Sequence, residues 1–169
     1  MGTVYERELK GILSGDEKIL ERCLKTCSPV ERENYRGILS KPFIVIRAAG
    51  SFGVDLVAIR GDYSFPIEEK SSAKTVLHFS GSQRLTEQAE HLRCECEKAG
   101  VIPLYAYRLK GFRGDAWRMF TLDIEGLEGR NKLLYSRLPH VSHTRNGNLV
   151  LRWEEGMPLN TLISYLCGP

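Results

Sequence analysis

The chain has 169 residues, of which 42% are hydrophobic, 27% charged and 9% aromatic, and this composition excludes collagen-like, disordered and disulfide-scaffold chains. Its net charge of +3 permits a polyanionic partner without requiring one. No apolar run approaches the roughly 20 residues that cross a bilayer. Because the first eight residues lack the apolar segment of a signal peptide, we expect a reducing, cytoplasmic location with the five cysteines as free thiols.

Helical patterns dominate the first forty residues. Apolar residues recur at helical spacing over 4–13, which predicts a short amphipathic helix. Gly15-Asp16 then opens a second helix, with an apolar stripe that continues to Cys27. A third helix is expected from Ser28 to about Leu39, because Ser28 and Glu31 match a capping box with Pro29 at the first helical position.

The pattern then changes to that of a mixed α/β domain. Strands are expected at Phe43–Arg47, Val54–Ile59 and Ser64–Lys70, as an antiparallel meander. A helix over 83–99 and strands over 101–109 and 116–124 follow. This order predicts a mixed β-sheet flanked by helices.

The C-terminal part has a different character. Asn146-Gly147 indicates a hairpin between 140–145 and 148–153, and a closing helix is expected from Pro158. We therefore predict a core over 1–125, in which 14–42 is a helical insertion, and an extension over 126–169 packed on that core.

The most informative stretch joins Asp55 to Glu68-Glu69-Lys70, thirteen residues further on. Glu68 and Lys70 are two apart on a strand, so both side chains leave the same face of the sheet, and the hairpin can bring Asp55 beside Glu68. Adjacent carboxylates need a cation, and Mg²⁺ is a natural one. Lys70 could then orient or deprotonate a water, or offset charge on a phosphorane-like transition state. The competing interpretation is a solvated face with a surface ion pair.

Five stretches of the sequence, taken in chain order, help to decide between a metal site and a solvated face. They are Tyr5-Glu6-Arg7-Glu8-Leu9, Arg47-Ala48-Ala49-Gly50-Ser51 with Val54-Asp55-Leu56-Val57, Ile67-Glu68-Glu69-Lys70, Gln88 to Gly100 with Ile102-Pro103-Leu104-Tyr105-Ala106, and Trp117-Arg118-Met119-Phe120. Together they resemble motifs of the archaeal Holliday junction resolvases, within the PD-(D/E)xK nuclease superfamily. The resemblance spans most of residues 1–124.

The resemblance implies a restriction-endonuclease-like core and a structure-selective DNA endonuclease that cleaves four-way junctions in recombination and repair. It implies that Glu6, Asp55 and Glu68 bind Mg²⁺, with Mn²⁺ as a substitute. It further implies that Lys70 is the catalytic lysine and that Ser51 places a hydroxyl near the scissile phosphate.

The implied partner is branched DNA, bound by a homodimer whose symmetry fits that of the junction. Arg7 and Arg47 would contact the DNA backbone. Lys74 and Arg84, between the catalytic strand and the next helix, are further candidates for phosphate contacts, although they could belong to a plain surface connection.

Three departures leave alternatives open. Val54 stands where the superfamily has Pro, and Glu69 stands where the resolvase strand has an apolar residue. Glu69 could mark an edge position, a second acidic partner, or a shifted register in which Glu69 is the ligand. Helix phase also leaves open whether Glu6 or Glu8 faces the site. The alternative functions are a related nuclease for flaps, mismatches or foreign duplex, and a junction-binding module that does not cleave.

Two further patterns have competing interpretations. Residues 105–118 interleave basic and aromatic side chains, which suits either a nucleic-acid surface or half-buried strands. The pairs Cys23/Cys27 and Cys94/Cys96 suggest buried thiols more than a zinc site.

Overall fold

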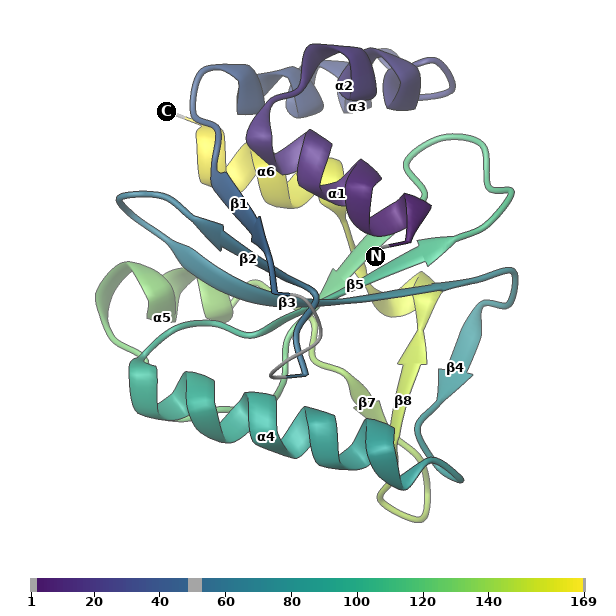
Figure 1. The fold of residues 1–169 in the computed structure, drawn as a ribbon, viewed down its shortest axis with the longest axis vertical. Helices are drawn as coiled ribbons and strands as arrows, with labels where there is room; N and C mark the ends of the chain where they lie inside the picture. The colour runs from purple at the N-terminus through teal and green to yellow at the C-terminus, as the bar shows by residue number, and fades with distance from the viewer. Residues whose placement is uncertain (1–2, 49–52, 169) are drawn as a thin grey trace.

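The chain forms a layered α/β structure in which a six-stranded mixed sheet lies between helices (Figure 1). This computed structural model describes residues 3–48 and 53–168. The strand order is β1-β2-β3-β5-β6-β9. The predicted fold class, a mixed sheet flanked by helices, is confirmed.

Three consecutive helices and the C-terminal helix cover one face of the sheet, here called the α1 side (Figure 1). They are α1 (Val4–Ser14), α2 (Glu17–Leu24), α3 (Pro29–Arg36, followed by the 3₁₀ turn Gly37–Leu39) and α6 (Leu159–Cys167). Thr3, Asp16 and Ser28 cap the first three, and Ser28 with Glu31 completes the expected capping box. Gly15 ends α1 in the left-handed conformation, with φ of 75°, which separates α1 from α2.

The predicted meander is confirmed. β1 (Ile44–Arg47), β2 (Leu56–Ile59) and β3 (Ser64–Ser72) pair antiparallel, with Leu56 opposite Ile67. β3 then pairs in parallel with β5 (Leu104–Leu109), which pairs antiparallel with β6 (Trp117–Phe120). The parallel pairing requires a crossover, and α4 (Gln83–Ala99) lies within it.

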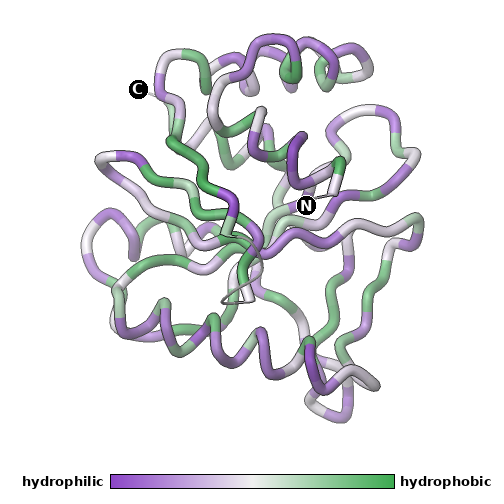
Figure 2. The backbone as a smooth tube through the Cα atoms, in the orientation of Figure 1, coloured by the Kyte–Doolittle hydropathy of each residue, from purple (hydrophilic) through white to green (hydrophobic). Residues whose placement is uncertain are grey.

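The opposite face of the sheet, here called the α4 side, packs on α4 and on a small second sheet of order β4-β8-β7. The small sheet consists of β4 (Val76–His78), β7 (Ser142–His143) and β8 (Leu149–Arg152). The expected hairpin around Asn146-Gly147 supplies β7 and β8, and β4 is a strand that the sequence analysis missed. Along α4, hydrophilic and hydrophobic segments alternate, as in an amphipathic helix with one buried side (Figure 2).

The segment after residue 125 contributes to both sheets and to the main core. It contains α5 (Gly129–Tyr135), the 3₁₀ turn Trp153–Glu155, the edge strand β9 (Met157–Pro158) and α6. α6 buries Leu159, Leu162, Ile163 and Leu166, the apolar face that its sequence predicts. Neither α5 nor β9 was expected. Among the described residues, no helix is both long and apolar enough to cross a membrane.

Candidate metal centre

Three carboxylates from separate elements meet on the α1 side of the sheet. Glu6 lies in the first turn of α1, Asp55 directly precedes β2, and Glu69 lies in β3. One carboxylate oxygen from each lies within 4.8 Å of the other two. Within residues 3–48 and 53–168, no other group of three metal-ligating side chains comes this close together.

Backbone and hydroxyl contacts hold this cluster in place. Asp55 Oδ2 accepts a hydrogen bond from the Glu69 backbone N–H at 2.7 Å. The Thr3 hydroxyl accepts from the Glu6 backbone N–H at 3.0 Å and donates to Glu69 Oε2 at 3.4 Å, so it joins the start of α1 to β3. The only cation paired with these three carboxylates in the described chain is Arg47, whose Nη2 lies 3.7 Å from Glu6 Oε2.

Glu69 is the most strongly buried of the three carboxylates. Only 7% of the residue is exposed, and no described donor lies within hydrogen-bond distance of its Oε1. Burial, reinforced by the Asp55 carboxylate, raises the pKa of Glu69 from 4.5 to about 7. A buried carboxylate oxygen without a donor is costly, and hard divalent cations take oxygen ligands of this kind. The donor set therefore fits Mg²⁺ or Mn²⁺.

Glu68 and Lys70 lie on the α4 side of the same strand. Their side chains form an ion pair, with 2.8 Å between Lys70 Nζ and Glu68 Oε1. Both residues line a pocket of about 390 Å³ together with Asp55, Ser82 and Arg84. Burial also raises the pKa of Glu68 to about 7, against the lowering effect of Lys70. Asp55 thus belongs both to the three-carboxylate cluster and to the lining of this pocket.

The structure brings two of the three expected metal ligands, Glu6 and Asp55, together with Glu69, the alternative ligand that the sequence left open. Glu6 and Asp55 are joined by Glu69, not by Glu68. The alternation of β3 explains this arrangement, because Phe65 and Ile67 belong to the core on the α1 side and Glu69 is next in the same phase. The spacing of Glu68 and Lys70 correctly placed both on one face, but on the face opposite to α1. The phase of Phe65 and Ile67 was the sequence signal that could have identified Glu69.

The structure also separates Glu6 from Glu8. Glu6 turns to the cluster, whereas Glu8 accepts hydrogen bonds from the Arg108 and Trp117 side chains at 2.8 Å each. Ser51 lies outside the described residues.

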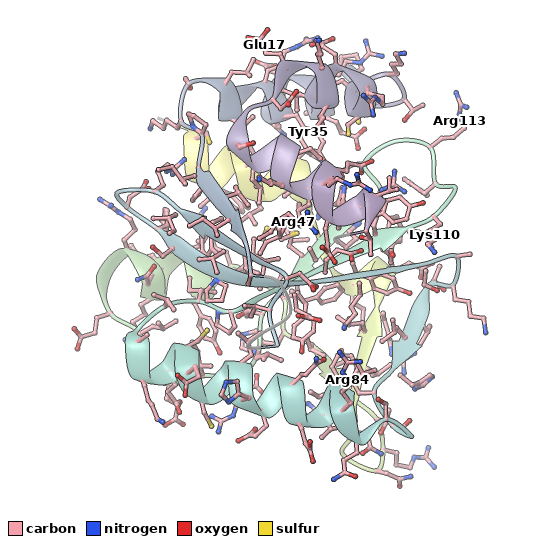
Figure 3. The ribbon with its side chains drawn as sticks, viewed as in Figure 1. Glu17, Tyr35, Arg47, Arg84, Lys110 and Arg113 are labelled. Atoms are coloured by element: carbon pink, nitrogen blue, oxygen red, sulfur yellow. The ribbon has the colours of Figure 1, made fainter. Side chains whose placement is uncertain are left out.

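The four expected DNA-contacting cations do not form one cluster. Arg7 is exposed beside Arg22 in a shallow depression, and Lys74 is exposed in the turn between β3 and β4. Arg47 lies near the three-carboxylate cluster, while Arg84 lies on the α4 side at the start of that helix (Figure 3). Arg47 and Arg84 thus lie near the candidate site on opposite sides of the sheet.

The interleaved aromatic residues of 105–118 are mostly core. Tyr105, Tyr107 and Trp117 are each at most 2% exposed, so they cannot stack on bases. Lys110 and Arg113 are exposed on and beyond the end of β5 (Figure 3). For the aromatic side chains of this segment except Phe112, which is 41% exposed, the half-buried strand interpretation is the better one.

The cysteines are free thiols, as expected. Burial raises the pKa of Cys23 and of Cys96 to about 12, which keeps both thiols protonated at neutral pH.

Comparisons with known proteins support the fold. No family model and no curated protein sequence matches the chain. Among solved structures, the chain is similar to Hjc, a Holliday junction resolvase from the archaeal hyperthermophile Archaeoglobus fulgidus, with a TM-score of 0.50 and 19% sequence identity. The match covers 88% of this chain and 92% of the resolvase chain. At this level of identity the likeness establishes a mixed α/β fold of the resolvase kind.

Proposed function

We propose that the chain is a metal-dependent DNA endonuclease that cleaves four-way (Holliday) junctions in recombination and repair, with Mg²⁺ as its ion and Mn²⁺ as a substitute. The observation that carries the proposal is the Glu6–Asp55–Glu69 cluster, in which no described donor reaches Glu69 Oε1, within a fold similar to that of a resolvase. Such a site suits phosphodiester hydrolysis better than a purely structural role, because among the described residues its three carboxylates have one paired cation, Arg47.

Glu6, Asp55 and Glu69 would hold the ion. When bound, a divalent cation supplies Lewis-acid activation of water and neutralises charge on the phosphate. Asp55 fixes the site relative to the sheet, because its Oδ2 accepts a hydrogen bond from the backbone N–H of Glu69 in β3. Arg47, beside Glu6, provides a positive charge toward the approaching DNA backbone.

The pocket on the α4 side would receive a neighbouring phosphate. The Glu68 carboxylate orients the Lys70 ammonium group, and Arg84 adds a guanidinium group at the same pocket. Arg7 and Lys74 would contact the DNA backbone further from the cleavage point, and Ser51 is proposed as a hydroxyl beside the scissile phosphate. The lysine and arginine side chains among these groups bind phosphate by charge, so their substitution should weaken DNA binding more at low salt than at high salt.

A homodimer is part of the proposal. Two opposed strands of a four-way junction must each be cut, and a twofold-symmetric pair of chains would present two identical sites to them. A monomeric chain would leave single nicks.

The direct test is cleavage of an immobile four-way junction and of a linear duplex of matching sequence, in Mg²⁺ and in Mn²⁺. We expect the wild type to cut the junction in preference. Asp55→Asn and Glu69→Gln should each lower the rate at least a hundredfold, whereas Glu90→Gln, on the exposed face of α4, should leave it unchanged. Equal rates for all four proteins would remove the assigned site. Equal cutting of duplex and junction would instead indicate a related nuclease for another DNA substrate.

A junction-binding module without turnover is the second candidate. The pairing of Lys70 with Glu68, on the face of β3 opposite to Glu69, favours it, because the expected catalytic lysine is engaged outside the cluster. Salt-sensitive junction binding with no cleavage in either ion would establish this function.

A further inference from the structure

We propose that Glu8, Arg108 and Trp117 form a positioning clamp that sets the first turn of α1, so that Glu6 completes the metal centre. The inference rests on the proposed function, since it concerns the same site. None of these three side chains belongs to the carboxylate cluster, so their role is to place a ligand and not to bind the ion.

The clamp converges on the Glu8 carboxylate. Glu8 Oε1 accepts from Arg108 Nε at 2.8 Å and from Trp117 Nε1 at 2.8 Å, and Oε2 accepts from Arg108 Nη2 at 3.5 Å. The Glu8 and Arg108 side chains are 20% and 19% exposed. A charge-assisted pair shielded to this degree is more rigid and stronger than an ion pair in open solvent.

Tyr5 gives the clamp a second contact one turn earlier on α1. The Arg108 guanidinium carbon lies 4.5 Å from the centroid of the Tyr5 ring, which is within cation–π distance. Residues three apart on a helix share one side of it, so Tyr5 and Glu8 together fix the rotation of α1 about its axis. At the N-cap of α1, before Tyr5, the Thr3 hydroxyl donates to Glu69 and so holds the start of the helix against β3.

Sheet register places the clamp beside the cluster. In the parallel pairing of β3 with β5, Glu69 lies opposite Ala106 and Ser71 lies opposite Arg108. Glu69 and Arg108 therefore lie on the same face, two residues apart along the strands. In the next pairing Arg108 lies opposite Trp117, so both donors of the clamp come from adjacent positions of the sheet. The sheet thus carries both donors of the clamp together with Glu69, and Asp55 directly precedes β2.

The consequence is a metal affinity that depends on residues outside the ligand set. A carboxylate ligand must be held to within about half an ångström of its working position. Leu9, Ile12 and Leu13 anchor the later turns of α1 in the core. The first turn, by contrast, loses its side-chain contacts without the clamp, and Glu6 is then held less firmly against Asp55 and Glu69. Outer contacts of this kind typically contribute about 10- to 100-fold to metal affinity.

Mn²⁺ binding to the DNA-free protein, followed by electron paramagnetic resonance, tests the clamp without any need for cleavage. Glu8→Ala should raise the Kd for Mn²⁺ about 10- to 100-fold. Glu8→Gln, which keeps an oxygen acceptor for the Trp117 indole and the Arg108 guanidinium, should raise it less. The matched control is Glu90→Ala, which breaks the Glu90–Arg93 pair of 2.7 Å on α4 and should not change the Kd.

The outcomes separate the clamp from the metal centre. If Glu6→Gln weakens Mn²⁺ binding but folded Glu8→Ala binds like the wild type with only a lower Tm, the clamp is merely structural and the inference fails alone. If the wild type binds no Mn²⁺, the proposed function fails together with it. Should Glu8→Ala not fold, Trp117→Phe removes the indole donor alone, and an unchanged Kd in that variant overturns the clamp.

Discussion

Two buried carboxylate centres in this protein are built in opposite ways. Asp115 is 2% exposed, and its two oxygens accept four hydrogen bonds: from the Tyr35 hydroxyl at 2.5 Å, the Trp117 backbone N–H at 3.2 Å, and the backbone and side-chain N–H groups of Asn160 at 2.9 and 2.7 Å. Glu69 is 7% exposed, lies against two other carboxylates, and has one oxygen without a described donor.

The difference distinguishes a carboxylate that is buried to stabilise the fold from one that is buried where a ligand can bind. Asp115 is satisfied from within and joins α3, the start of β6 and α6, so it stabilises the fold without any ligand. No described residue donates a hydrogen bond to Glu69 Oε1, so this oxygen is available to a ligand. Native proteins satisfy nearly all buried polar groups, so the exception marks the place where a ligand is expected.

The largest effect that would sharpen this comparison is the loss of Asp115. Asp115→Ala leaves buried donors on Tyr35, Trp117 and Asn160 without an acceptor, so the free energy of unfolding should fall by about 3–5 kcal/mol. Urea denaturation measures it. Asp123→Ala is the control, because the Asp123 side chain is 65% exposed and its loss should change stability by less than about 0.5 kcal/mol. Similar losses in both variants would contradict a structural role specific to Asp115.

The opposite behaviour is expected of Glu69 when metal is added. Ca²⁺, a hard cation of the same ligand preference, at about a hundred times its Kd should raise the free energy of unfolding of the wild type by about 2.7 kcal/mol. Glu69→Gln should lose most of this increase, and a chelator should reverse it. Thermal or urea unfolding with and without Ca²⁺ provides the measurement. An equal gain in wild type and Glu69→Gln would place the ion elsewhere.

The pH dependence of the metal-free protein gives a third contrast. The pKa of Glu69 is raised from 4.5 to about 7 by burial, so between these values the folded chain holds a proton that the unfolded chain has released. Stability contributed by this group is therefore complete below about pH 4.5 and falls as pH rises toward 7.

Glu69→Gln has no ionisable group at this position, so it should not lose stability as the pH rises from 4.5 to 7. A pKa raised from 4.5 to about 7 is a change of about 300-fold in proton affinity, and each tenfold corresponds to about 1.4 kcal/mol, so the variant should be more stable than the chelator-treated wild type at pH 8 by about 3 kcal/mol. The two proteins should converge near pH 4. Glu90→Gln is the control, because the Glu90 side chain is 61% exposed and paired with Arg93 on α4, so its loss should not stabilise the protein at pH 8. Parallel stability profiles for wild type and Glu69→Gln would contradict the raised pKa.

These two centres also show what the sequence could and could not predict. Local patterns were sufficient for the capping box at Ser28, the antiparallel meander and the closing helix, because each depends on neighbouring residues. Asp55 was identified because an aspartate among apolar residues needs a partner. The choice between Glu68 and Glu69 stayed open, because the spacing of Glu68 and Lys70 identifies a common face of the strand but not which helix covers that face.

The Asp115 centre had no comparable signal. Its partners Tyr35 and Asn160 lie 80 and 45 residues away, and no motif links the three positions. Predicting it requires knowing that α3 and α6 pack side by side, which is a property of the tertiary fold.

The smallest expected effect concerns how the predicted insertion and the predicted extension hold each other. Asn34, in α3, donates through Nδ2 to Asn160 Oδ1 at 3.0 Å, and Asn160 in turn contacts Asp115. Asn34→Ala removes one partly buried hydrogen bond, so it should lower the free energy of unfolding by about 1 kcal/mol. In an Asp115→Ala background the same substitution should cost less, because Asn160 has already lost its anchor. A double-mutant cycle by urea denaturation measures this coupling. Strict additivity would mean that the contacts of Asn34 and of Asp115 with Asn160 contribute to stability independently of each other.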